Sequence, residues 1–304
     1  MSNIIAIVWD FDKTLINGYM EDPIFEEYGV NPNDFWNETN ALPEKYMREQ
    51  NVKVNPDTIY LNQLLAYTKR GVFKGLNNKK LRSYGEKLPF YPGVPDIFKR
   101  TQEVVSNDKI CEEYGIRVEH YIVSTGLKEI IAGSPVADYV SGIWGCEFIE
   151  TTNPEGQQII GEIGYTIDNT TKTRALFEIN KGVGKSDGVE VNTSLPENMR
   201  RVHFINMVYV ADGPSDIPAF SVVNNNGGAT FAVYPKGDMR AMRQVEQMRK
   251  DERINMFAEA DYSQDTTVSM WLENKIQEFA ENIKAQEKQK LERFTSAGLP
   301  RHLN

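Results

Sequence analysis

Two carboxylates follow the first apolar segment of the chain, and their spacing suits a shared pocket. Asp10 and Asp12 come directly after residues 4–9, an unbroken run of apolar side chains. Such a run is typical of a strand that is buried on both faces of a parallel sheet. Residues two apart in an extended chain point the same way, so both carboxylates can face one site. Because close carboxylates repel each other, the pair predicts a hard divalent cation, most simply Mg²⁺.

A second acidic pair ends another apolar segment. Residues 204–211 are predicted to form a strand, and Asp212 and Asp216 follow it around a Gly-Pro turn. Each pair alone also fits an Asp-rich surface turn. In open α/β sheets, however, ligands bind beyond the carboxyl ends of the strands. The two pairs together therefore indicate one site at that edge of the sheet.

A hydroxyl pair and a lysine add to this pattern. Residues 120–123 are predicted to form a strand, which ends at Ser124 and Thr125 before a helix. A helix N-terminus suits anion binding because its N–H groups are free, although the same residue types also serve as simple caps. Lys172 falls in the first turn of another predicted helix. There it opposes the helix dipole, which a bound anion would explain, and an exposed surface lysine is the alternative.

Strands and helices alternate along most of the chain, which predicts an α/β fold. Further strands are expected at residues 143–149, 158–165 and 229–234, the first two as a hairpin, with a possible edge strand at 260–262. Residues 239–257 and 266–283 have a helical pattern. Residues 17–88 lack strand periodicity, and Pro23, Pro43 and Pro56 are predicted to begin helices there.

This pattern divides the chain into three parts. Residues 1–16 and 89–283 form the predicted core, residues 17–88 a helical insert, and residues 284–304 a charged, mobile tail. The second half of the insert is basic. A solvated helix face is the simplest interpretation, and a field that attracts an anionic substrate is the alternative.

Composition limits the classes of function. The 304 residues are 40% hydrophobic and 25% charged, as in a globular protein, and the net charge of −9 argues against nucleic-acid binding. No apolar run is long enough to span a membrane. Cys111 and Cys146 lack metal-binding spacing, so we expect two buried thiols in a reducing, cytoplasmic setting. The sequence does not indicate an oligomeric state.

Taken in order, these segments resemble the haloacid dehalogenase-like (HAD) superfamily of phosphohydrolases. The first family motif, DxDx(T/V), matches residues 10–14, and the second matches the strand that ends at Ser124. Lys172 matches the third motif, and residues 212–216 match the acidic fourth motif, DGxxD. The segment between the third and fourth motifs is longer than in compact members, which leaves Lys181 and Lys185 as rivals of Lys172.

The resemblance implies a Rossmannoid three-layer domain with a parallel sheet and a helical C1-type cap inserted after the first strand, as in the phosphoserine-phosphatase-like branch. It implies that Asp10 is the nucleophile and Asp12 the general acid and base. Mg²⁺ would be held by the Asp10 carboxylate, the Asp12 backbone carbonyl and Asp212, with Asp216 orienting that shell or adding to it. Ser124, Thr125 and Lys172 would bind the phosphoryl group of a small phosphorylated metabolite.

Three other functions stay open at this level. A dehalogenase is disfavoured because carbon–halogen chemistry needs no acid two residues after the nucleophile. A phosphotransferase would use the same residues with an alcohol in place of water. A non-catalytic phospho-ligand-binding protein is disfavoured because every motif residue is present.

Overall fold

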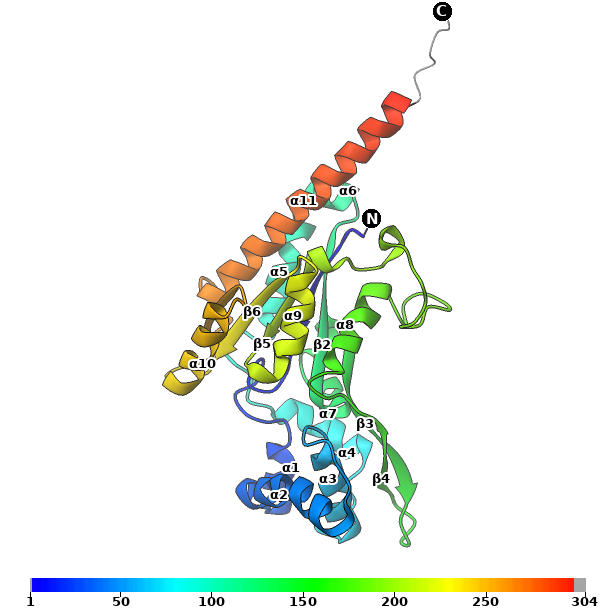
Figure 1. Ribbon diagram of the computed structural model, residues 1–304, viewed down its shortest axis with the longest axis vertical. Coiled ribbons are helices and arrows are strands. Elements are labelled where there is room, and N and C mark those ends of the chain that lie inside the picture. Colours follow the sequence, from blue (N-terminus) through cyan, green and yellow to red (C-terminus); the bar gives the residue numbers. More distant parts are fainter. Residues whose placement is uncertain (1, 298–304) are drawn as a thin grey trace, which may run out of the picture.

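The structure is a computed structural model that describes residues 2–297. Within these residues, seven strands form one sheet in the order β4-β3-β2-β1-β5-β6-β7 (Figure 1). All neighbours are parallel except β3 and β4, which form the predicted antiparallel hairpin. The strands are β1 Ile4–Trp9, β2 Arg117–Leu127, β3 Val140–Thr152, β4 Gln158–Tyr165, β5 Met207–Ala211, β6 Ala229–Tyr234 and β7 Met256–Glu259.

Helices cover both faces of the sheet, which confirms the predicted α/β fold (Figure 1). Helices α5 and α11 pack on one face, and α8, α9 and α10 pack on the other. The helices are α1 Asp22–Tyr28, α2 Pro32–Gln50, α3 Ile59–Lys69, α4 Asn78–Tyr84, α5 Asp96–Ser106, α6 Lys109–Glu113, α7 Lys128–Ala132, α8 Lys172–Lys181, α9 Ile217–Asn225, α10 Met239–Lys250 and α11 Thr267–Ala297.

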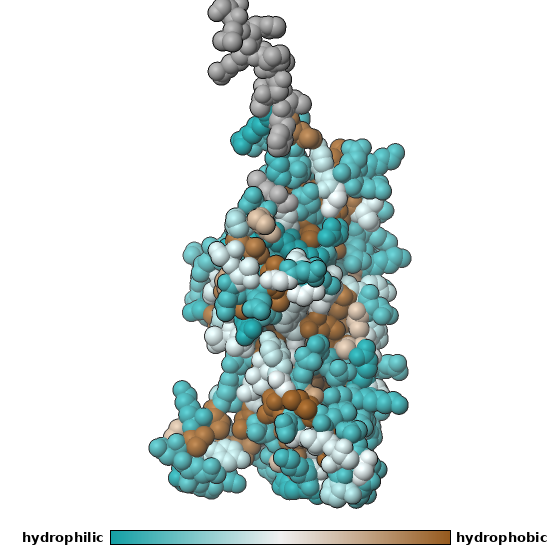
Figure 2. Space-filling model, turned by 90° about the vertical axis from the view of Figure 1, so that its right-hand side faces the viewer, coloured by the Kyte–Doolittle hydropathy of each residue, from teal (hydrophilic) through white to brown (hydrophobic). Residues whose placement is uncertain are grey.

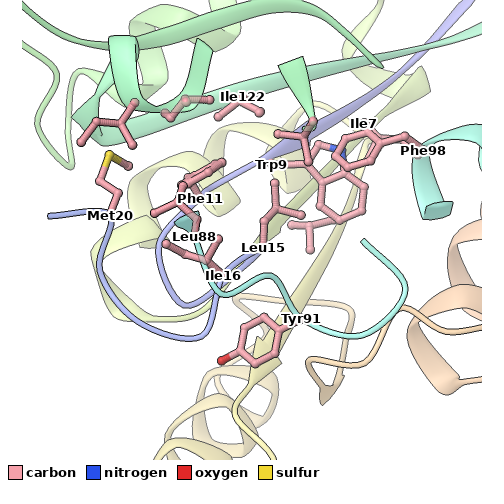
Figure 3. Close-up of a cluster of buried hydrophobic side chains, with 14 of the residues drawn as sticks. Ile7, Trp9, Phe11, Leu15, Ile16, Met20, Leu88, Tyr91, Phe98 and Ile122 are labelled. Atoms are coloured by element: carbon pink, nitrogen blue, oxygen red, sulfur yellow. The ribbon is translucent and has the colours of Figure 1, made fainter. Parts of the chain in front are cut away.

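Strand β1 is fully buried because each of its faces meets a different core. Its alternate residues Ile5, Ile7 and Trp9 join the larger apolar cluster, which includes α5 and α11. The intervening residues join the cluster under α8, α9 and α10. Figure 3 shows Trp9 beside Ile7 and Phe98 in the first of these cores. A side chain buried on this scale stabilises the fold by roughly 1.5–3 kcal/mol, so β1 holds a rigid position.

The chain leaves and re-enters the sheet domain at neighbouring points. After β1 the backbone turns tightly, with Lys13 in the left-handed region at φ 57°. Ile16 then forms a bridge with Phe90, and the Asn17 N–H donates to the carbonyl of Pro89 at 2.8 Å. The segment between these points contains α1 to α4, which lie together at one end of the molecule (Figure 1). We call residues 17–88 the cap.

The β3–β4 hairpin extends beyond the sheet to meet the cap. The Ile160 N–H donates to the carbonyl of Leu76 at 2.9 Å, and the Asn78 Nδ2 donates to the carbonyl of Phe148 at 3.0 Å. The hairpin runs alongside the cap helices in Figure 1. The cap therefore rests on a part of the chain that follows the second motif, in addition to its own two connections.

Three expectations about individual elements were wrong. Pro43 lies inside α2, which begins at Pro32, where the Asn31 side chain accepts from the Asn33 N–H at 2.9 Å. The last strand is Met256–Glu259 and not residues 260–262, because Met256 to Glu259 pair in register with β6. The helix that we expected over residues 239–257 ends at Lys250, and residues 251–255 connect α10 to β7.

The predicted mobile tail begins within a helix. Helix α11 continues through residue 297, and the rest of the tail lies outside the described residues. Its sequence there is rich in helix-forming Glu, Gln, Lys and Ala. Lys284 also donates to Asp108 at 2.7 Å, which ties this part of α11 to the turn before α6. Within residues 2–297 no helix is long and apolar enough to cross a membrane.

Candidate active site

The two acidic pairs lie at the point where the strand order reverses. Strand β1 has β2 on one side and β5 on the other, so the carboxyl ends of β1 and β5 flank a topological switch point. Asp10 continues the β1 ladder, because its N–H donates to the carbonyl of Val210 in β5 at 2.9 Å. Asp212 follows β5 directly. Parallel register therefore brings together carboxylates that are 202 positions apart in the chain.

Lys172 is buried between two of these carboxylates. Its Nζ lies 2.6 Å from an oxygen of Asp10 and 2.7 Å from an oxygen of Asp216. Lys172 therefore forms an ion pair with each of Asp10 and Asp216. Burial alone lowers the pKa of Lys172, but the two carboxylates outweigh burial and raise that pKa above its ordinary value. The ammonium is consequently a fixed positive charge in the site.

The start of α8 explains how Lys172 reaches this position. The Asp168 carboxylate accepts from the N–H groups of Thr170 and Thr171 at 3.0 and 2.6 Å, so it fixes the turn that leads into the helix. The rival lysines lie elsewhere: Lys181 donates to two backbone carbonyls of the following loop, and Lys185 is exposed.

Three carboxylates form a cluster that fits a metal ion. One oxygen from each of Asp10, Asp212 and Asp216 lies within 4.8 Å of the others. Three carboxylates and one ammonium leave a net charge of −2 when all are ionised, and carboxylate oxygens are the ligands that Mg²⁺ prefers. The donor set therefore fits a divalent hard cation. Burial, followed by the charges of Asp10 and Asp216, raises the pKa of Asp212 to about 7.

Asp216 and Asp10 have further partners that fix their side chains. The hydroxyl of Tyr209, a buried residue of β5, donates to Asp216 at 2.5 Å. The hydroxyl of Thr14 donates to the second oxygen of Asp10 at 2.9 Å. Burial raises the pKa of Asp10, and Lys172 opposes that shift. The Asp10 carboxylate thus accepts a hydrogen bond from the Lys172 ammonium on one oxygen and from the Thr14 hydroxyl on the other.

The Asp12 carboxylate points away from this cluster. It accepts a hydrogen bond from the Met20 N–H at 3.0 Å, and its side chain lines a cavity of about 120 Å³ beneath the cap. Burial, then the charges of Glu21 and Asp10, raises its pKa well above the ordinary value. A raised pKa favours the protonated form of this carboxyl group, which is the form a general acid requires.

Ser124 and Thr125 lie at the end of β2, next to β1. The Ser124 hydroxyl is buried and accepts from the Gly126 N–H at 3.0 Å. Thr125 lines the cavity, and its carbonyl accepts from the hydroxyl of Tyr60 in the cap at 2.7 Å. Their predicted contact with a phosphoryl group stays a prediction.

Sequence reasoning missed the cap residues that face Asp12. Glu21 is only 2% exposed and lines the cavity, together with Tyr19, Trp36 and Tyr60. Trp36 and Tyr60 are large aromatic residues of a type common in any core, and nothing in the sequence marks Glu21. None of the basic residues of the cap lines this cavity.

Comparisons with known proteins identify a sequence relative and structures of similar fold. The chain is 36% identical over 287 residues to an uncharacterized protein of Borreliella burgdorferi, covering 90% of this chain and 97% of that one. No family model matches the sequence. A HAD-family hydrolase of Salmonella enterica serovar Typhi superposes with a TM-score of 0.51 at 14% identity, covering 84% of this chain and 67% of that one. Substrate-bound phosphoserine phosphatase gives 0.46 at 18% identity, with coverages of 83% and 91%.

The fold is that of a HAD-family hydrolase, and the four motifs that resemble the haloacid dehalogenase-like superfamily lie in order around one site. The chain belongs to the same family as the Borreliella protein.

Proposed function

We propose that the protein is a Mg²⁺-dependent phosphatase that hydrolyses a small phosphomonoester through an aspartyl phosphate. The observation that carries this proposal is the buried Asp10–Lys172–Asp216 contact beside Asp212. Asp10, Asp212 and Asp216 would hold the ion with the Asp12 carbonyl. When bound, the ion would supply positive charge for the transferring phosphoryl oxygens.

The chemical steps follow from the positions of the two carboxyl groups. A carboxylate oxygen of Asp10 attacks phosphorus, and the bond from phosphorus to the ester oxygen breaks. Asp12 gives its proton to that departing oxygen. In the second step Asp12 takes a proton from a water molecule, which attacks phosphorus and releases inorganic phosphate from Asp10.

The other polar groups stabilise charge and orient the nucleophile. Lys172, which donates a hydrogen bond to Asp10, would also neutralise an equatorial phosphoryl oxygen. Ser124 and Thr125 would donate further hydrogen bonds to the phosphoryl group. The hydroxyl of Thr14 holds the second Asp10 oxygen in place. The closed cap would exclude bulk water from the Asp12 side.

The test is phosphate release from a panel of phosphomonoesters with Mg²⁺, for the wild type and for Asp10→Asn. We expect Asp10→Asn to lower kcat by at least ~10³-fold, as for other nucleophile replacements. The variant keeps the Thr14 hydrogen bond and the Lys172–Asp216 pair, so it should fold. Asp34→Asn, on the exposed side of α2, is the matched control and should be unaffected.

Rapid quenching during turnover should capture phosphate on wild-type protein in a hydroxylamine-sensitive bond. Wild-type-like turnover by folded Asp10→Asn protein would refute the covalent mechanism. Adding alcohols as acceptors distinguishes a phosphotransferase, which would yield phosphorylated acceptor in place of inorganic phosphate.

A further inference from the structure

The cavity beneath the cap is the place where a leaving group would sit. It is lined by Asp12, which in the proposed function protonates the ester oxygen, and by residues of α2 and α3. Its volume is about 120 Å³, which is enough for a small leaving group.

The walls of this cavity combine aromatic rings with carboxyl groups. Tyr19 and Trp36 have ring centroids 5.7 Å apart, and Trp36 and Tyr60 have centroids 6.1 Å apart. Besides Asp12, the carboxyl groups of Glu21 and Asp57 line the same space. None of the residues that line it is Lys, Arg or His. Aromatic faces and carboxylates share a preference for positive charge.

Glu21 is a buried carboxyl group of this wall. It is 2% exposed, and within the described residues no other residue donates a hydrogen bond to its carboxyl group. Burial raises its pKa to about 7. Asp57 differs, because it already accepts from the Asn169 N–H at 3.3 Å. A buried carboxyl group that accepts from no other residue favours a ligand that brings a positive charge or a hydrogen-bond donor into the cavity.

The other opening of the site is lined by charges of both signs. A cavity of about 290 Å³ is lined by Lys13 and Arg240 and by Asp212 and Asp238. The Lys13 ammonium contacts the Tyr19 hydroxyl at 2.5 Å, so this contact lies between the two cavities. Of these two cavities, the one beneath the cap is lined by acidic side chains without a basic one.

We infer that the leaving group carries a cationic nitrogen, so that the substrate class is a phosphomonoester of a small amino alcohol, including quaternary ammonium alcohols. This inference rests on the proposed phosphatase function. The cation would lie against Trp36 and Tyr60, with Glu21 ionised opposite it. A substrate that also carries a carboxylate, such as an O-phosphoamino acid, would find no basic side chain in this cavity.

A pair of isosteric esters tests the inference directly. Phosphocholine and 3,3-dimethylbutyl phosphate have the same shape, but only the first has a positive charge in the leaving group. We expect kcat/KM to be roughly 10–100-fold higher for phosphocholine or phosphoethanolamine than for the neutral ester, from cation–π and charge contacts of about 1–3 kcal/mol. O-phosphoserine should be a poorer substrate than phosphoethanolamine.

Glu21→Gln should remove most of this preference while leaving hydrolysis of p-nitrophenyl phosphate, which needs no cation site, within a few-fold. Asp34→Asn is again the control, since it removes a carboxylate from the exposed side of the helix that carries Trp36. If Glu21→Gln does not fold, Asp57→Asn tests the same wall, because its amide oxygen can still accept from Asn169. Choline, but not 3,3-dimethylbutanol, should inhibit hydrolysis of p-nitrophenyl phosphate.

The outcomes separate the two proposals. If p-nitrophenyl phosphate and every other ester are left intact, the proposed function fails. If p-nitrophenyl phosphate is cleaved but the neutral ester equals phosphocholine, or if choline does not inhibit, the phosphatase stands and the cationic leaving group is wrong. A preference that persists in both folded Glu21→Gln and Asp57→Asn would also overturn it.

Discussion

Lys172 should contribute to the stability of the fold as well as to the site, because it is a buried cation between two buried carboxylates. Its side chain is 2% exposed, and Asp10 and Asp216 are 7% and 0% exposed. Removal of one partner from a buried ionic group leaves charges without compensation, which is far more costly than loss of a surface pair.

We therefore expect Lys172→Met to lower the free energy of unfolding by about 3–5 kcal/mol in metal-free buffer. Urea unfolding measures this, with Lys181→Met as the control, for which the loss of two hydrogen bonds to backbone carbonyls should cost about 1–2 kcal/mol. Mg²⁺ should recover more stability in Lys172→Met than in the wild type. A cost for Lys172→Met below that of the control would contradict the argument.

Asp212 links metal binding to pH. Its pKa is raised to about 7 in the folded protein, whereas an Asp in the unfolded chain has an ordinary pKa of about 4. Between these two pH values, the metal-free folded protein therefore holds a proton on Asp212 that the unfolded chain has lost. The stability of the metal-free protein should accordingly fall as pH rises from about 4 to 7 through this group. A bound cation must displace that proton.

Mg²⁺ affinity should therefore weaken up to about tenfold per pH unit below pH 7 and level off above it. Calorimetric titration at pH 6 and pH 8, in buffers of different ionisation enthalpy, measures both the affinity and the number of protons released. Asp212→Asn should abolish the proton release. An affinity that is the same at both pH values would show that Asp212 does not hold the ion.

At the scale of elements, β1, β2 and α5 meet around one neutral histidine. The Trp9 Nε1 donates to His120 Nδ1 at 3.1 Å, and His120 Nε2 lies 3.1 Å from the Thr101 hydroxyl and 3.2 Å from the carbonyl of Phe98. Because Nδ1 accepts, the proton of the neutral ring is on Nε2. Burial lowers the pKa of His120 to about 3.

The folded state consequently excludes a proton that the unfolded chain binds below its ordinary pKa of about 6.5. Stability from this group is complete above pH 6.5 and is lost progressively as pH falls towards 3. At pH 5 the expected loss is about 2 kcal/mol. His120→Gln should be less stable at pH 7 but should lack this part of the pH dependence, as measured by urea unfolding at pH 7 and pH 5. Parallel pH profiles for the two proteins would count against a buried neutral histidine.

At the scale of the whole molecule, the cap packs on the core through a shared apolar cluster, and hydrogen bonds beside the site add to this contact. The Tyr60 hydroxyl donates to the Thr125 carbonyl, and the Asn55 side chain donates to Asp168 at 2.8 Å. The second contact reaches the turn before α8, so the cap and the position of Lys172 are physically connected. The surface in Figure 2 has only small, separated hydrophobic patches on the face that it shows.

We expect the double variant Asn55→Ala/Tyr60→Phe to open the cap more often, because each hydrogen bond contributes about 1 kcal/mol. Amide hydrogen exchange in α3 should accelerate by roughly tenfold or more, and KM should rise more than kcat falls. Ser83→Ala removes a hydrogen bond within the cap and serves as the control. Unchanged exchange in α3 would indicate that these contacts do not hold the cap closed.

The sequence alone determined the central strand and the two carboxylates that follow it. Six apolar residues in succession, followed by Asp10 and Asp12, are a local pattern, and the structure has β1 over the same residues. The two connections of the cap, beside Ile16 and Phe90, also followed from where strand periodicity stops and resumes. Local signals of this kind survive folding because burial on both faces and turn chemistry are decided within a few residues.

The tertiary structure alone decided which distant groups meet. The sequence favoured Lys172 by its place at a helix start but left Lys181 and Lys185 as rivals, because all three lie in or near one helix. It did not mark Glu21, whose environment depends on the docking of α2 and α3 over Asp12. Pairing with β6 likewise places residues 256–257, the expected end of a helix, in β7. Each of these outcomes depends on contacts between segments that are far apart in the chain, and a local pattern carries no information about such contacts.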